Sequence, residues 1–191
     1  MPDAVRGAAR TFPAEPPELD AGRVTLRRPE ERDVPDYLAA CADPDVARWF
    51  GVPPGYSEDD ARRYLTETVP REWAIGREAV FAVAEGDTCV GTVDLRVRDG
   101  DPGLGEVGYL LAPGARGKGY ATAAVRAISR WGFAALGLRR IEIRVEDGNE
   151  PSRRVAAKAG FTEEGLMRQA LVINGTPRDF WVSSLLRNEV E

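Results

Sequence analysis

The chain has 191 residues, of which 43% are hydrophobic and 30% charged, and its formal net charge is −5 at pH 7. These values are typical of one globular domain, and no apolar run approaches the roughly 20 residues of a membrane-spanning helix. The absence of histidine excludes Ser-His-Asp hydrolases, Cys-His proteases and helical zinc-protease motifs. Any chemistry must therefore use carboxylates, hydroxyls, backbone amides or a cofactor.

The N-terminal segment and the cysteines predict the extent of the domain and its compartment. Residues 1–21 are rich in proline and lack the apolar stretch of a secretory signal, so we expect a flexible tail before a single domain over residues 22–191. Cys41 and Cys89 stand in no metal or redox spacing, and each falls in an apolar segment that suits a buried thiol. We expect a cytoplasmic protein, monomeric or homodimeric, with reduced thiols and no metal.

The first elements are a strand and two helices. Alternation over residues 24–28 indicates the strand. The first helix is expected to be capped by Asp33 and broken at Asp43-Pro44. The second opens with a capping box variant at Ser57, and Pro70 ends or kinks it.

The remaining elements alternate between strand patterns and helical periodicity. The helix over residues 120–136 is the clearest, with apolar residues at spacings of three and four and Gly137 at its end. This order predicts a mixed α/β sheet with helices on both faces. The other expected elements are a hairpin of residues 80–85 and 88–97, a turn at 99–103, strands at 106–111, 140–145, 161–173 and 179–186, and a helix at 152–159.

Positive charge is concentrated in one part of the chain. Residues 111–160 contain ten Lys and Arg but four Asp and Glu, so this segment carries +6 and the remainder carries −11. Such a segment suits a compact polyanionic ligand and, less directly, leaves an acidic surface for a cationic substrate. The same charges also fit solvated helix and strand faces, and charge alone leaves both interpretations open.

Two glycine signatures are present without the structural context that they require. Residues 103–108 fit the G-x-G-x-x-G string of dinucleotide-binding folds, but a strand is expected there in place of a helix. Gly117-Lys118 is similar to part of an ATP-binding P-loop, but Gly119 replaces the magnesium-binding hydroxyl and Ala112 replaces the first glycine. We therefore reject both interpretations.

The loop before the clearest helix indicates an anion site. Small residues at positions 117, 119 and 121 let a phosphate approach the backbone, and the first helical turn offers unpaired N–H groups. Glycines before a helix are also common in ordinary strand–helix turns. The spacing alone does not decide between these two interpretations.

The run Arg116-Gly117-Lys118-Gly119-Tyr120-Ala121 resembles the Q/R-x-x-G-x-G/A pyrophosphate signature of the GNAT superfamily of acyltransferases. Leu26-Arg27 with Asp33, Glu106-Val107-Gly108-Tyr109, Asn149-Glu150-Pro151-Ser152 and Gly160-Phe161 resemble the RimJ/RimL branch of ribosomal-protein alanine acetyltransferases. The resemblance covers residues 22–187. It implies a mixed, mostly antiparallel, twisted sheet of about seven strands, splayed at the cofactor site and covered by helices on both faces.

The resemblance also implies that acetyl-CoA is the co-substrate. The backbone amides of residues 116–121 then bind the pyrophosphate, and the backbones of Leu110 and Leu111 pair with the pantetheine amides. The amide near Leu110 is expected to polarise the thioester carbonyl. Asn149 is expected to bond the pantetheine arm, and an Asx turn that caps the following helix is a compatible alternative.

Two further residues are candidates for proton handling. Many family members protonate the departing thiolate with a tyrosine seven residues after the Asn, where this chain has Ala156. The resemblance gives that role to Ser152, which would support the thiolate by a hydrogen bond, although a serine at a helix start also fits a capping role. Glu106 is a candidate base acting through water, or a solvated strand residue. Tyr109 and Trp49 are candidates for the acceptor pocket or for the core.

The resulting prediction is acetyl transfer from acetyl-CoA to a primary amine by direct attack in a ternary complex. An N-terminal α-amine, with a pKa near 8, needs less help from a base than a lysine with a pKa of about 10.4. A small amine such as a polyamine or an antibiotic stays open as the acceptor. Alternatives are another donor such as succinyl-CoA, or a non-catalytic acyl-CoA sensor. No nucleic-acid or membrane partner is expected.

Overall fold

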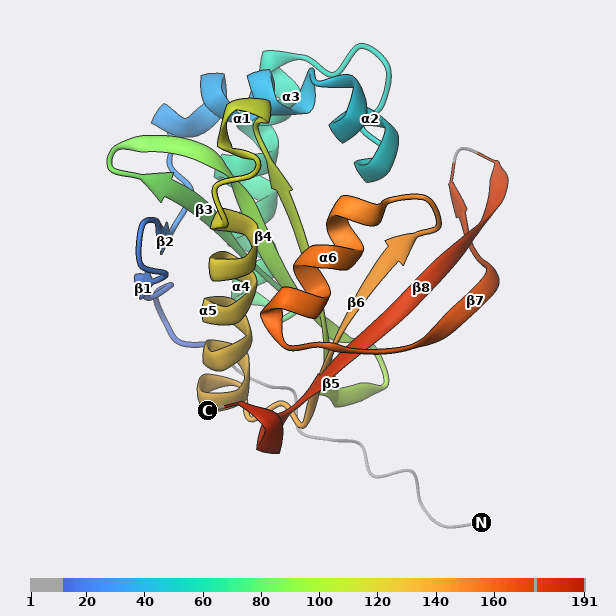
Figure 1. Ribbon diagram of the computed structural model, residues 1–191. Helices are drawn as coiled ribbons and strands as arrows, with labels where there is room; N and C mark the ends of the chain where they lie inside the picture. Colours follow the sequence, from blue (N-terminus) through green and yellow to red (C-terminus); the bar gives the residue numbers. More distant parts are fainter. Residues whose placement is uncertain (1–11, 174, 191) are drawn as a thin grey trace.

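A twisted eight-stranded sheet forms the centre of the computed structural model, which describes residues 12–190 except residue 174 (Figure 1). The strand order is β1-β2-β3-β4-β5-β6-β8-β7, and every neighbouring pair is antiparallel except β5 and β6. The mixed, mostly antiparallel sheet is thus confirmed. The strands are β1 (Leu19–Asp20), β2 (Thr25–Arg27), β3 (Glu78–Glu85), β4 (Thr88–Arg98), β5 (Asp101–Leu111), β6 (Arg140–Glu146), β7 (Thr162–Ile173) and β8 (Thr176–Leu186).

Helices cover both faces of this sheet, as expected (Figure 1). On one face α5 (Tyr120–Ala135) and α6 (Glu150–Ala159) pack over a core that includes Phe81, Val107 and Ile128. On the other face α1 (Val34–Cys41), α2 (Pro44–Phe50) and α3 (Glu58–Arg63) enclose a second buried cluster. The side chains of neighbouring β5 residues alternate between the two, since Leu111 joins the first cluster and Leu110 the second.

The helix signals in the sequence hold only in part. The capping box at Ser57 is present, because its hydroxyl accepts from the Asp60 amide at 3.2 Å and the Asp60 carboxylate accepts from the Ser57 amide. Pro70 does not end this helix. The chain continues from α3 through a π-helical turn (Tyr64–Thr68) into α4 (Val69–Ala74), where Pro70 occupies the first turn and its missing N–H is not needed.

The breaker at Asp43-Pro44 is also the start of a helix that the sequence analysis did not predict. Asp43 accepts a hydrogen bond from the Val46 amide at 3.1 Å, and Pro44 stands at the first helical position. Both are favourable N-terminal signals for α2. The expected side-chain cap by Asp33 is wrong, because this buried carboxylate instead accepts two hydrogen bonds from Arg27 at 2.7 Å each.

We expected a flexible tail over residues 1–21, and this prediction is wrong for residues 12–21. Phe12 is 8% exposed and packs edge-on against Trp73, with ring centroids 5.1 Å apart, and against Trp131. The indole N–H of Trp73 donates to the carbonyl of Pro13 at 2.9 Å. An apolar ring among prolines therefore anchors this segment, which also supplies β1 and raises the number of strands to eight. Residues 1–11 lie outside the described part.

The two strands at the centre of the sheet separate toward one end. β5 pairs in parallel with β6 only where residues 104–106 face residues 140–142. β4 and β5, in contrast, remain paired as far as the Gly91–Leu111 pair. The last five residues of β5 therefore have a neighbour on one side only, which is the splay that the resemblance implied. The G-x-G-x-x-G string at residues 103–108 lies inside β5, so it lacks the following helix that a dinucleotide-binding motif requires.

Candidate active site

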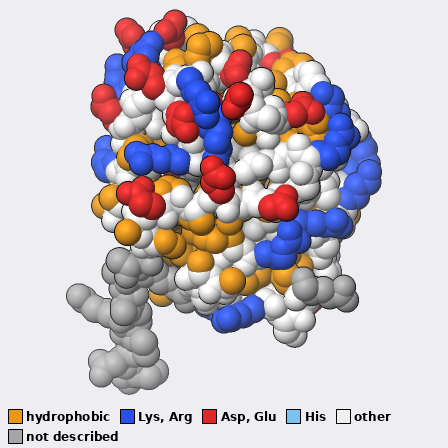
Figure 2. All heavy atoms as spheres, turned by 90° about the vertical axis from the view of Figure 1, so that its left-hand side faces the viewer, with side chains coloured by type: hydrophobic (Ala, Val, Ile, Leu, Met, Phe, Trp, Pro, Cys, Tyr) orange, Lys and Arg blue, Asp and Glu red, His pale blue; other side chains and the backbone are white. Residues whose placement is uncertain are grey.

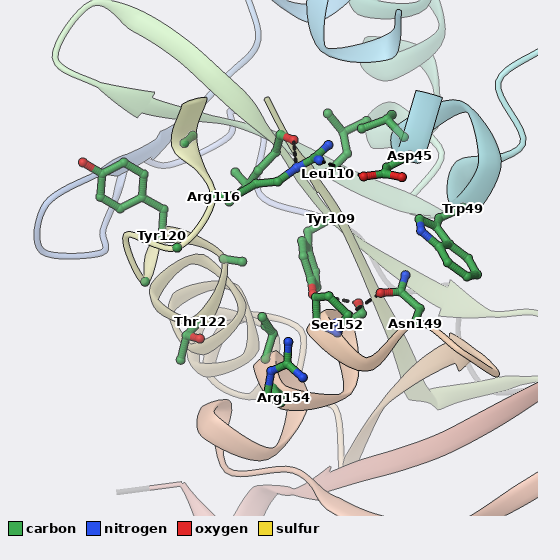
Figure 3. Close-up of a pocket in the computed structure, with 18 of the residues that line it drawn as sticks. Asp45, Trp49, Tyr109, Leu110, Arg116, Tyr120, Thr122, Asn149, Ser152 and Arg154 are labelled. Atoms are coloured by element: carbon green, nitrogen blue, oxygen red, sulfur yellow. Dashed lines mark hydrogen bonds and ion pairs between the residues drawn. The ribbon is translucent and has the colours of Figure 1, made fainter. Parts of the chain in front are cut away.

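A cavity of about 400 Å³ opens where β5 and β6 separate. Its walls come from α2, the end of β5, the loop that leads into α5, the first turn of α5, and α6 from its start to Lys158 (Figure 3). The lining residues are Asp45, Val46, Trp49, Phe50, Tyr109, Leu110, Leu111, Ala115, Arg116, Gly117, Gly119, Tyr120, Ala121, Thr122, Asn149, Pro151, Ser152, Arg154, Val155 and Lys158.

The loop before α5 has the geometry of an anion cradle. Gly117 and Gly119 adopt φ values of +75° and +84°, which favour glycine, and a Cβ atom on either would meet nothing within 4 Å. Among the described residues no side chain caps α5, which leaves its first N–H groups available to a ligand. The open space, the small residues and the helix dipole together suit a phosphate group.

Arg116 serves this loop through its side chain in a way that the sequence analysis did not predict. Its guanidinium donates to Asp43 Oδ1 at 2.5 Å, to Asp45 Oδ2 at 3.3 Å and to the Leu111 carbonyl at 3.3 Å. The hydrogen bond from Arg116 lowers the pKa of Asp43. Arg116 therefore connects the loop to the start of α2. Both Arg116 and its partner Asp45 line the cavity.

Lys118 is the one residue of the predicted loop that does not line the cavity. Its ammonium lies 3.8 Å from a carboxylate oxygen of Glu85, the last residue of β3. The hydroxyl of the buried Tyr120 also donates to Glu85, and the Arg23 guanidinium stands 5.3 Å from the Tyr120 ring centroid. These contacts hold Lys118 and the Tyr120 hydroxyl on the side of the loop away from the cavity, while Gly117 and Gly119 line the cavity.

The register of β5 corrects the expectation for the Leu110 amide. The amide of Ala112 donates to Val90 of β4, whereas the carbonyl of Gly103 accepts from Arg139 on the β6 side. Because successive residues of a strand turn their backbone groups to alternate neighbours, the even-numbered residues of β5 face β4. The N–H and C=O groups of Tyr109 and Leu111 face the splay instead. Arg116 bonds the Leu111 carbonyl on that side.

Asn149 and Ser152 lie at the start of α6, beside Tyr109 (Figure 3). The helix begins two residues before the expected position, and Asn149 caps it by accepting from the Ser152 amide at 3.2 Å. The Ser152 hydroxyl does not cap the helix. Its oxygen lies 2.7 Å from the Tyr109 hydroxyl oxygen, and both side chains line the cavity. Burial raises the pKa of the Tyr109 phenol.

The structure does not place Glu106 in the cavity that Ser152 lines. Its side chain leaves the face of β5 opposite to that of Tyr109 and does not line the cavity. It contacts Arg144 at 3.5 Å and Arg98 at 3.9 Å, and burial raises the pKa of its carboxyl, opposed by Arg96 and Arg98. The role of Glu106 as a base stays a prediction.

The cavity contains residues that sequence reasoning missed. Trp49 was expected there, but its neighbour Phe50, 43% exposed, and Asp45 come from the unpredicted helix α2. Arg154 and Lys158 were counted in the basic segment but not placed in the site. Their spacing of four on one helix puts them on the same face of α6. Within the described residues neither forms an ion pair with a carboxylate.

The described residues contain no group of three or more His, Cys, Asp or Glu arranged to hold a metal ion. Among the same residues, no helix has the length and apolar character that crossing a bilayer requires. Cys41 and Cys89 are buried free thiols in this part of the chain, and burial raises the pKa of both.

Comparisons with known proteins connect this geometry to a family. Residues 23–162 match the model of the acetyltransferase (GNAT) domain. The chain is 32% identical to the uncharacterised N-acetyltransferase p20 of Bacillus licheniformis over 87% of its own length and 94% of that protein. A shorter match, 32% identical over 39% of this chain and 40% of the relative, is to spermidine N(1)-acetyltransferase of Escherichia coli.

A solved structure extends the likeness to the whole domain. Mycobacterium smegmatis RimJ in complex with CoA-disulfide superposes with a TM-score of 0.76 at 30% identity, over 91% of this chain and 88% of that one. The signature loop before α5, the splay of β5 from β6 and the family match describe the same region of the chain. The chain therefore belongs to the GNAT family of acetyltransferases and is an N-acetyltransferase.

Proposed function

We propose that this enzyme transfers an acetyl group from acetyl-CoA to a primary amine by direct attack within a ternary complex. The observation that carries the proposal is the continuity of one cavity from the anion cradle before α5 to the Tyr109 and Ser152 hydroxyls at the splay. Such a cavity can hold a long ligand with phosphates at one end and a reactive thioester at the other. The CoA-disulfide bound to the related RimJ supports the same ligand class.

We assign each part of the cofactor to the cavity residues whose chemistry suits it. The pyrophosphate fits the amides of residues 116–121, and Arg154 and Lys158 supply positive charge on the facing helix. The pantetheine arm fits the splay, where the backbone of Tyr109 and the N–H of Leu111 can pair with its amides, while the Leu111 carbonyl accepts from Arg116. This arrangement replaces the predicted role of the Leu110 amide, while Leu110 still contributes its side chain to the cavity wall.

The same geometry suggests how the reaction proceeds. The neutral amine attacks the thioester carbonyl, and a backbone amide of Tyr109 or Leu111 stabilises the developing oxyanion. As the tetrahedral intermediate collapses, the C–S electron pair moves to sulfur, where the Ser152 hydroxyl supports the thiolate. No covalent enzyme intermediate is required. The amine nitrogen loses its extra proton to water, and Glu106, which does not line the cavity, can act as a base only through such water.

Two classes of acceptor have support from the relatives. The resemblance of the sequence to ribosomal-protein alanine acetyltransferases favours a protein N-terminal α-amine, and the match to a spermidine acetyltransferase favours a polyamine. The α-amine is the better match to this site, because Asp45, the one carboxylate among the described lining residues, is paired with Arg116, and a pKa of about 8 leaves a larger neutral fraction of the amine at pH 7. Trp49 and the exposed Phe50 offer apolar surface to the residues that follow such an N-terminus.

A thiol-release assay tests the proposed function. Acetyl-CoA is incubated with N-terminal peptides, spermidine and an aminoglycoside, and mass spectrometry then locates the acetyl group on the product. We expect release of free CoA with N-terminal peptides as the fastest acceptors. Faster release with succinyl-CoA would redefine the donor. Binding of CoA in calorimetry without turnover on any acceptor would support an acyl-CoA sensor and contradict the proposal.

A further inference from the structure

The contact between Tyr109 and Ser152 joins two elements that are distant in the sequence. Tyr109 belongs to β5 and Ser152 to the first turn of α6, and their hydroxyl oxygens are 2.7 Å apart. Figure 3 shows both side chains pointing toward each other at the centre of the cavity, with Asn149 beside them. Their position, where β5 leaves β6, is the position assigned above to the thioester.

Counting donors shows what this contact provides. Two hydroxyl groups carry two protons, and their mutual hydrogen bond uses one of them. The second proton has no acceptor among the described residues, so it is left for a group in the cavity. Burial raises the pKa of Tyr109, which keeps the phenol protonated and able to donate at neutral pH.

The direction of the bond decides which hydroxyl faces the ligand. The backbone amide of Ser152 donates to the side-chain Oδ1 of Asn149 at 3.2 Å, which fixes the Cα of Ser152 at the helix start. The hydroxyl rotor of a serine is otherwise free to turn. A phenol is a stronger acid than an aliphatic alcohol, so the favoured arrangement has Tyr109 donating and Ser152 accepting. The remaining Ser152 O–H then points away from Tyr109, into the cavity.

We propose that Tyr109 is a positioning residue that donates to the Ser152 oxygen and thereby aims the Ser152 O–H at the sulfur of the departing coenzyme. This inference rests on the proposed function. As the C–S bond breaks, sulfur takes the electron pair and receives the Ser152 proton, and Ser152 is reprotonated by Tyr109. Tyr109 recovers its proton from water, to which the amine nitrogen loses its own proton, so atoms and charge balance. The pair thus does the work of the tyrosine that Ala156 replaces.

A double-mutant cycle tests this inference. The variants Tyr109→Phe, Ser152→Ala and the double variant are compared with the unmodified chain for kcat, KM for acetyl-CoA, CoA affinity by calorimetry and Tm. Tyr37→Phe is the matched control, because Tyr37 is buried in the other cluster, where it stacks on Tyr64 away from the cavity. It loses a phenol hydroxyl without touching Ser152.

We expect Tyr109→Phe to lower kcat by about 5- to 100-fold with CoA affinity and KM nearly unchanged, and the double variant to be no slower than Ser152→Ala alone. Losses that multiply in the double variant would show that Tyr109 acts independently of Ser152 and would overturn the inference. An unchanged kcat in a folded Tyr109→Phe would overturn it as well. Failure of the proposed function is distinct, because the unmodified chain itself would then bind CoA without turnover.

Discussion

At the scale of single residues, substitutions of Ser152 and Asn149 can distinguish the proposed catalytic role from helix capping. The capping bond of α6 belongs to Asn149, whereas the Ser152 hydroxyl faces Tyr109. We predict that Ser152→Ala lowers kcat by about 10- to 1,000-fold with little change in Tm, because its hydrogen bond strengthens mainly in the transition state. Asn149→Ala is the matched variant and should cost about 1 kcal/mol of unfolding free energy. Normal turnover by a folded Ser152→Ala would remove the serine from the mechanism.

Glu78 gives the molecule a pH-dependent stability. Burial raises the pKa of Glu78 from 4.5 to about 7, with Asp94 adding to this rise and Arg96, 3.1 Å away, opposing it. Between these two values the folded chain holds a proton that the unfolded chain has lost. The free energy of unfolding therefore falls as pH rises through this window, by at most about 1.4 kcal/mol per pH unit.

The prediction is that Glu78→Gln flattens this dependence. Urea unfolding at pH 5 and at pH 7.5 should differ less for Glu78→Gln than for the unmodified chain, because the amide cannot titrate. Glu67→Gln is the control, since Glu67 is exposed and forms no ion pair with another described residue. A Glu78→Gln variant that keeps the full difference between the two pH values would assign the titration to another group.

At the scale of elements, the start of α5 is the part of the site that a substitution can test most cleanly. Gly119 has φ +84° and faces open space in the cavity, so Gly119→Val combines backbone strain with a side chain in the space that we propose for the pyrophosphate. Gly100→Val in the β4–β5 turn has a similar φ of +80° and no role in the cavity. We predict that both lose stability, and that Gly119→Val alone weakens CoA binding, by about tenfold or more. Equal CoA affinity of both variants would place the phosphates elsewhere.

The elements also show what sequence patterns can and cannot predict. Long segments with clear periodicity, such as residues 120–136 and the hairpin around Gly86-Asp87, were predicted nearly to their bounds. Short elements were missed, because α2 and β1 are stabilised by tertiary contacts rather than by their own periodicity. The Leu110 amide was misassigned for a different reason. Which neighbour a backbone group faces depends on strand register, and a single sequence does not reveal register.

At the scale of the whole molecule, the excess positive charge of residues 111–160 is largely neutralised by contacts with other segments. Arg116 pairs with Asp43, Arg140 with Glu164 and Arg153 with Glu163, all at 2.9 Å or less. Figure 2 nevertheless shows Lys and Arg side chains gathered toward the right of the face it presents. Both interpretations of the charge pattern thus hold for different residues, since most of these cations serve the fold and a few remain for a ligand.

The unpaired cations of the cavity lead to a prediction about how CoA affinity depends on salt concentration. Arg154 and Lys158 line the cavity and form no ion pair with a described carboxylate, so they are expected to meet the cofactor's phosphates. The double variant Arg154→Gln and Lys158→Gln should raise the Kd for CoA by about tenfold or more and should flatten its rise between low and high salt. Arg130→Gln on α5 is the control, because Arg130 is exposed, equally free of ion pairs among the described residues, and outside the cavity. Calorimetry of the three proteins across a salt series separates local contact from the general field of the molecule. If Arg130→Gln changes the salt dependence as much as the double variant does, long-range attraction rather than contact at α6 accounts for the affinity.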